Sequence, residues 1–64
     1  MEKLKELLIN IDKIEDDQEF VEKENEVIRQ YCIDNNFNIT EDDMNEIIQR
    51  GMEDAYAYWK EEFS

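Results

Sequence analysis

The fold is decided by residues 40–63, which have the sequence TEDDMNEIIQRGMEDAYAYWKEEF. Apolar residues recur there at steps of three and four, which places them along one side of a helix. Thr40 is a suitable N-cap, Asp43 stands at the capping-box position, and acidic residues crowd the first turn, where the helix dipole favours negative charge. The pattern predicts one continuous helix over residues 41–63. Its apolar stripe consists of Met44, Ile47, Ile48, Gly51, Met52, Ala55, Tyr58, Trp59 and Phe63.

The stripe covers nearly half of the helix circumference, which is more than a one-sided surface helix needs. Gly51 is costly in a helix interior, by about 1 kcal/mol relative to alanine. Because Ala55 follows one turn later, we expect the two small residues to let another helix approach closely. Tyr56, at the edge of the stripe, is the aromatic residue that we expect to be exposed. The predicted helix-packing or dimer face is Ile47, Gly51, Ala55, Tyr58 and Trp59.

Two further helices are predicted upstream, over residues 2–15 and 17–33. The first places Leu4, Leu7, Leu8, Ile11 and Ile14 on one face, and the second does so with Phe20, Val21, Val27, Ile28 and Tyr31. Residues 34–38 are rich in Asn and Asp, which favour turns because their side chains bond the local backbone. The chain is therefore expected to form one helical domain over residues 1–64. The fold class is all-α, either a small three-helix bundle or a helical hairpin completed by homodimerisation.

Glu24 falls in the middle of the apolar face of the second helix. We expect this carboxylate to lie at the rim of the face, where it reaches water. The alternative is a carboxylate paired in an interface, with Arg29 or Arg50 as its partner.

Catalytic chemistry has few candidates in this composition. The chain has no histidine, so the most common general base is missing, and Cys32 is the single cysteine. A zinc site or a disulfide would each need more ligands or thiols than the chain offers. The segment from Asp34 to Asn45 resembles a calcium loop only in its first half, because Ile39 replaces the turn glycine and Asn45 the bidentate glutamate. We therefore expect no enzyme activity, no metal and no cofactor.

Net charge is the strongest functional signal. The 19 acidic and 7 basic side chains give a formal charge of −12 at pH 7. Such a surface repels nucleic acid and anionic membranes and attracts basic proteins. The acids are densest in residues 15–26, and a merely solvated helix face is the alternative explanation of that run. The predicted partner-binding face is Glu15, Asp16, Asp17, Glu19, Glu22, Glu26, Asp42, Glu46, Glu53 and Asp54.

Two functions fit these features. The first is an acidic decoy that binds and inhibits a basic, nucleic-acid-binding protein by occupying the place of the nucleic acid. In size and charge the chain is similar to small acidic helical proteins of phages and mobile elements, including DNA-mimic antirestriction and anti-CRISPR proteins; this similarity is one of composition. The second is a helical dimerisation or regulatory interaction module with a solvated acidic face.

A cytoplasmic location is expected for either function. The longest apolar stretch near the N-terminus, Leu7 to Ile9, is too short for a signal-peptide core or a membrane span. A lone cysteine is typical of a reducing compartment. No membrane partner is expected.

Overall fold

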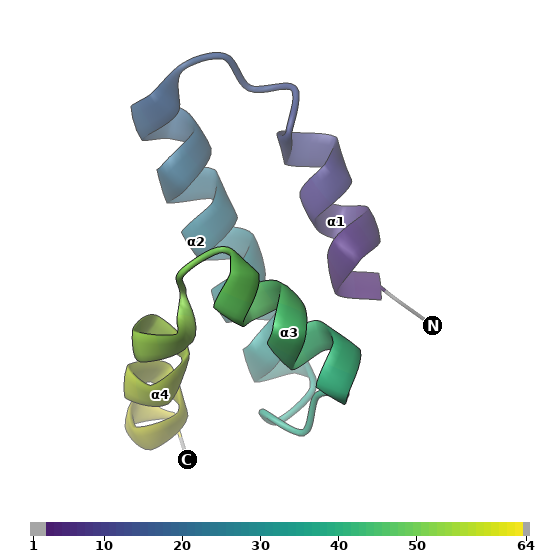
Figure 1. The fold of residues 1–64 in the computed structure, drawn as a ribbon. Coiled ribbons are helices and arrows are strands. Elements are labelled where there is room, and N and C mark those ends of the chain that lie inside the picture. Colours follow the sequence, from purple (N-terminus) through teal and green to yellow (C-terminus); the bar gives the residue numbers. More distant parts are fainter. Residues whose placement is uncertain (1–2, 64) are drawn as a thin grey trace.

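The computed structural model describes residues 3–63, which are helical with short connections (Figure 1). The helices are α1 (Lys3–Ile11), α2 (Asp17–Asp34), α3 (Glu41–Gln49) and α4 (Glu53–Glu62). The all-α prediction is confirmed, but this part of the chain forms four helices where three were predicted. Residue 2, where the first predicted helix begins, lies outside the described residues.

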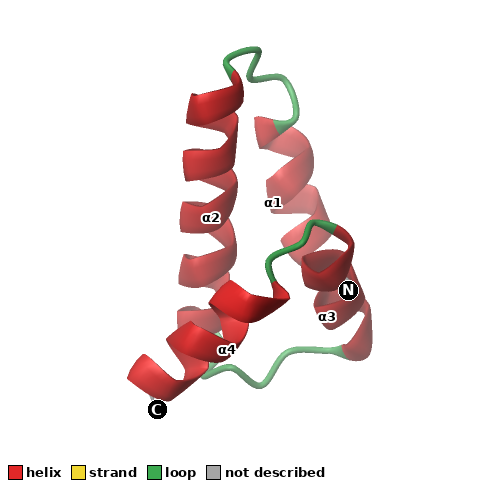
Figure 2. Cartoon of the chain, turned by 60° about the vertical axis from the view of Figure 1, so that its left-hand side comes forward, coloured by secondary structure: helices red, strands yellow, loops and turns green. Residues whose placement is uncertain are grey.

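α1 and α2 run antiparallel and form a hairpin (Figures 1 and 2). α1 ends at Ile11, four residues before its predicted end, because the chain must already reverse direction. Asp16 then starts α2, with its side chain accepting a hydrogen bond from the Glu19 backbone N–H at 2.9 Å. Asp16 therefore acts as an N-cap, and the predicted bounds of α2 are correct to within one residue.

A small core joins all four helices. α3 packs against α1, and α4 packs against the C-terminal half of α2 (Figures 1 and 2). Leu7 and Val21 were expected to face inward, yet both are exposed. Val21 lies in the first turns of α2, beyond the part that α4 covers. The buried core consists of Leu4, Leu8, Ile11, Ile28, Cys32, Ile47, Tyr56 and Trp59.

The predicted helix over residues 41–63 is interrupted at Gly51. Gly51 has a φ of +75°, which lies in the left-handed region that favours glycine. Its N–H donates to the Ile48 carbonyl, and the Met52 N–H donates to the Ile47 carbonyl, each at 3.0 Å. These two bonds form a Schellman motif, with Gly51 at the position just past the end of α3. The prediction of a single helix is therefore wrong.

The break changes which residues face the core. In α4, Tyr56 and Trp59 point inward, whereas Tyr58 is 65% exposed. The predicted exposure of Tyr56 is wrong, because the chain enters α4 in a new direction and the periodicity of α3 does not continue. Gly51 does not receive a neighbouring helix either, since no atom beyond its two chain neighbours lies within 4 Å of the position that a Cβ would take.

Gly51→Ala is expected to lower the free energy of unfolding by about 1–2 kcal/mol, the strain of a left-handed backbone at a residue with a Cβ. Steric crowding does not contribute to this loss, because the Cβ of alanine would contact no atom beyond its two chain neighbours. Urea denaturation followed by circular dichroism measures the change. Gly51→Asn is the matched control and should be milder, because asparagine tolerates this conformation better. A helix-interior glycine would respond in the opposite direction, with alanine raising stability by about 1 kcal/mol.

Candidate partner-binding surface

The outward side of α2 carries a row of carboxylates. Glu19, Glu22 and Glu26 recur at steps of three and four residues and are all exposed. They span about 10.5 Å of helix axis at 1.5 Å per residue. The opposite side of α2 is buried in the core through residues such as Ile28 and Cys32. Packing of the inward side therefore fixes the orientation of these three residues, which we call the α2 acidic row.

Few groups neutralise this row. Lys23 Nζ lies 3.5 Å from Glu26 Oε1, and Gln18 Nε2 donates to Glu22 Oε1 at 3.5 Å. Both contacts are exposed, and pairs of this kind contribute little free energy. Glu19 forms no ion pair among the described residues. The negative charge of the row is thus available to a partner.

The remaining predicted acids of the N-terminal half extend the row. Glu15, Asp16 and Asp17 are exposed at the start of α2, where the helix dipole favours negative charge. Asp16 has the additional structural task of capping the helix. The structure therefore places the six predicted acids of residues 15–26 on α2 and on the two residues that precede it.

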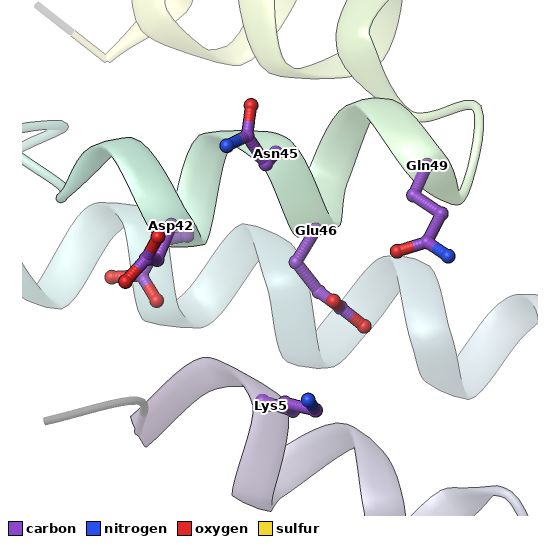
Figure 3. A pocket seen from close by; sticks show the side chains of 6 residues that line it. Lys5, Asp42, Asn45, Glu46 and Gln49 are labelled. Carbon is purple, nitrogen blue, oxygen red and sulfur yellow. The ribbon is translucent and has the colours of Figure 1, made fainter.

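The predicted acids of α3 lie elsewhere. Asp42 and Glu46 face Lys5 of α1 across a small polar pocket of about 110 Å³ (Figure 3). Glu53 and Asp54 are exposed in the first turn of α4. These four acids do not belong to the α2 acidic row, so the predicted face is divided among three helices.

Arg50 gathers three carboxylates at the junction between the helices. It forms an ion pair with Glu24 of α2, its Nε donates to Glu46 of α3 at 3.2 Å, and an N–H group lies 3.5 Å from Asp12, just after α1. Glu24 is only 7% exposed, so the expected position at the rim is wrong. The alternative pairing with Arg50 is confirmed. We call these four residues the Arg50 cluster.

The protonation of Arg50 reflects this environment. Burial works to lower the pKa of its guanidinium, but hydrogen bonds to Glu24 and Glu46 outweigh that effect and raise the pKa above its ordinary value. The charge of Arg50 is therefore retained, and the partly exposed carboxylate of Glu46 is already paired with it. Sequence reasoning had placed Glu46 on the partner-binding face.

Asp43 is a second buried acid, and the bond between its carboxylate and Tyr31 was not predicted. Its backbone N–H donates to Thr40 Oγ1 at 3.1 Å, which confirms Thr40 as the N-cap of α3. Its carboxylate accepts a hydrogen bond from the Tyr31 hydroxyl at 2.8 Å. Burial, together with this bond, raises the pKa of Tyr31 to about 12. Tyr31 is thus held in place as a neutral hydrogen-bond donor.

Cys32 has the properties of a core residue. The thiol is fully buried, and burial raises its pKa to about 11. Because the thiolate is the reactive form, the environment suppresses nucleophilic chemistry at this position.

The residues of the predicted helix-packing face separate in the structure. Ile47 and Trp59 lie in the core and Ala55 is half-buried against it, whereas Gly51 and Tyr58 are exposed. The break at Gly51 is the reason, because it ends the continuous stripe on which the face depended.

A groove between α1 and α2 was missed by sequence reasoning. Two neighbouring hollows of about 410 and 300 Å³ share Leu7, Tyr31 and Asp34 as lining residues. We call them together the hairpin groove. Leu7 and Tyr31 were both assigned to the core, so their periodicity gave no sign of a surface. Leu7 is 44% exposed, which the packing of the helices reveals and the sequence pattern does not.

Comparison with protein-family models, with curated proteins and with solved structures found no match for this chain. Among residues 3–63, no helix has both the length and the apolar character needed to cross a membrane. The same residues contain no group of three or more acidic, cysteine or histidine side chains placed to hold a metal ion.

Proposed function

We propose that this protein is a decoy that binds the basic, nucleic-acid-binding surface of a partner protein and inhibits it by excluding the nucleic acid. The α2 acidic row is the observation that supports this proposal. It places three charges over about 10.5 Å, and each strand of duplex DNA carries one charge per about 3.4 Å of axis. The two linear charge densities agree to within a factor of about two.

Rigidity of the row strengthens the case. α2 has 18 residues, and its inward side is held by the core and by the pairing of Glu24 with Arg50. Carboxylates on a pre-organised helix lose less freedom on binding than carboxylates on a flexible chain. The net charge of −12 would also accelerate the encounter with a basic partner.

We place the protein, under this proposal, in the cytoplasm and among the acidic inhibitors of phage or mobile-element type, of which antirestriction and anti-CRISPR proteins are examples. The alternative is a dimerisation or regulatory module, which would need a continuous apolar stripe along residues 41–63. The break at Gly51 interrupts that stripe, so the acidic surface carries the stronger argument.

Neutralising the α2 acidic row is expected to abolish most of the inhibition. The variant is Glu19→Gln, Glu22→Gln and Glu26→Gln, and the probe is the heparin-binding fraction of the source organism's lysate mixed with a short fluorescein-labelled DNA duplex. The protein should displace the duplex, which lowers the anisotropy. Exposed pairs contribute about 0.2–1 kcal/mol each, so losing three should raise the half-maximal concentration roughly tenfold.

The matched control removes the same charge from α4, as Glu53→Gln, Asp54→Asn and Glu62→Gln. It should keep most of the inhibition. If both variants lost the same amount of inhibition, net charge alone would explain the inhibition and the α2 acidic row would have no special role. Direct binding of the protein to the heparin-binding fraction that is as strong at high salt as at low salt would sink the decoy proposal, because contacts between charges weaken as salt screens them.

A further inference from the structure

The hairpin groove opens on the side of α1 that faces away from α3. Lys5 of α1 lines the pocket shared with α3, and Leu7 stands about 200° further round the helix at 3.6 residues per turn. α3 therefore covers one side of α1 and leaves the groove open on the other. Leu7 is 44% exposed, and the residues that line the groove come from α1, α2 and Asn35 just after α2.

The floor of the groove is apolar and pre-formed. Leu7 projects from α1, while Val27 and Tyr31 project from α2. The Tyr31 ring is fixed because its hydroxyl donates to the buried carboxylate of Asp43 at 2.8 Å. A groove with an apolar floor between two packed helices is the kind of surface that accepts an amphipathic helix.

The rim of the groove is acidic. Glu6, Glu26 and Asp34 line it, and neither hollow has a lysine or arginine among its lining residues. Gln30 donates to Asp34 at 2.8 Å and Lys23 lies 3.5 Å from Glu26, which leaves further lone pairs on both carboxylates. The rim therefore favours an occupant with positive charges beside an apolar centre.

The negative charge of the rim determines which kind of molecule can bind in the hairpin groove. A second copy of this chain would bring another net charge of −12 against the rim, and anionic lipid or nucleic acid would be repelled in the same way. A basic amphipathic helix matches both the apolar floor and the acidic rim.

We propose that the hairpin groove binds a basic amphipathic helix of the partner protein. Its apolar side chains, spaced by three and four residues, would lie against Leu7, Val27 and Tyr31, and its flanking lysines or arginines would meet Glu6, Glu26 and Asp34. This inference rests on the proposed decoy function and names the kind of segment that is recognised. Glu26 belongs both to the rim and to the α2 acidic row, so one partner can contact the two surfaces together.

Two synthetic peptides test the inference by fluorescence anisotropy with the full chain. One is a lysine–leucine helix with leucines at helical spacing, and the other has the same composition in scrambled order. The helical peptide should bind at least roughly tenfold more tightly, because only it offers one apolar side to the groove. Equal binding of both peptides would overturn the groove while leaving a purely electrostatic decoy intact.

Leu7→Ser should weaken binding of the helical peptide by roughly tenfold, as expected for an apolar anchor at the centre of an interface. The matched control is Ile48→Ser, because Ile48 is 46% exposed and lies outside the groove. Equal loss in the two variants would contradict the assignment of the groove.

Asp34→Asn provides a second variant that should not disturb folding, because a negative charge at a helix C-terminus is unfavourable. It should weaken the helical peptide roughly threefold, the effect of one exposed charge pair. Unchanged binding would show that Asp34 does not contribute to peptide binding at the rim. DNA displacement by the unaltered protein reports on the decoy function, and the comparison of the helical with the scrambled peptide reports on the groove, so the two proposals can fail independently.

Discussion

Arg50→Met is expected to lower the free energy of unfolding by about 3–5 kcal/mol, because it leaves a buried carboxylate without its partner. That carboxylate is Glu24, which lies in the middle of α2 and is paired with Arg50. A domain of this length is stable by roughly 3–10 kcal/mol in total. The variant should therefore be largely unfolded or close to it. Urea denaturation followed by far-ultraviolet circular dichroism measures the loss.

Two further variants separate the buried pair from a general loss of positive charge. Arg29→Met removes a guanidinium that stacks on the exposed Phe63 ring at 4.9 Å, and it should cost no more than about 1 kcal/mol. Glu24→Leu combined with Arg50→Met should recover most of the stability, because no buried charge remains at that position. A double variant as unstable as Arg50→Met alone would refute the explanation.

Tyr56→Ala is expected to lower the free energy of unfolding by about 3 kcal/mol, as is usual for removing a buried aromatic ring. Tyr56 is 8% exposed, and its ring meets that of Phe37 edge to face at 5.9 Å. Its hydroxyl also donates to the Phe37 carbonyl at 3.2 Å. The same denaturation experiment gives the value.

Tyr58→Ala is the matched control, two residues away on the same helix. Tyr58 is exposed, and its replacement should change the stability by no more than about 0.5 kcal/mol. The pair of variants distinguishes the interrupted helix from a continuous one over residues 41–63, which would bury Tyr58 and expose Tyr56. Equal losses of stability in the two variants, or a larger loss for Tyr58→Ala, would contradict the burial of Tyr56 and the exposure of Tyr58 in α4.

Local signals in the sequence were sufficient wherever the structure depends on neighbouring residues. Thr40 caps α3 because its hydroxyl reaches an N–H three residues later. The turn after α2 forms where Asn36 takes a positive φ of 55°, as the run of Asn and Asp predicted. In both cases the interaction that decides the conformation lies within a few residues, so one sequence contains it.

Distant contacts decided the features that sequence reasoning got wrong. Gly51 is unfavourable in a helix interior and favoured just past a helix end, but the apolar periodicity on both sides of it predicted a continuous helix. The packing of Tyr56 and Trp59 in the core follows from the break. The burial of Glu24 depends on Arg50, which lies 26 residues away. Periodicity cannot identify such a pair, although it did identify Glu24 as an unusual position.

The same limit applies to the candidate surface. The acidic run of residues 15–26 is local to the start of α2 and its loop, and its exposed members can be found from the sequence. The burial of Asp43 cannot be found in this way, because it depends on Tyr31, which lies twelve residues away. Glu46 pairs with Arg50 four residues later, a spacing that is visible in the sequence. The hairpin groove depends on two helices meeting, and its floor residues look like core residues in each helix alone.

α1 and α3 have nine residues each and α4 has ten, which is shorter than the roughly 12–15 residues that an isolated helix needs in water. Only α2, among the described helices, exceeds that length. The Arg50 cluster in turn requires the α1–α2 loop, α2 and α3 to be in place together. Folding is therefore expected to start on α2 and to finish in a single cooperative step, and the surface that would meet a partner is carried by the first segment to form.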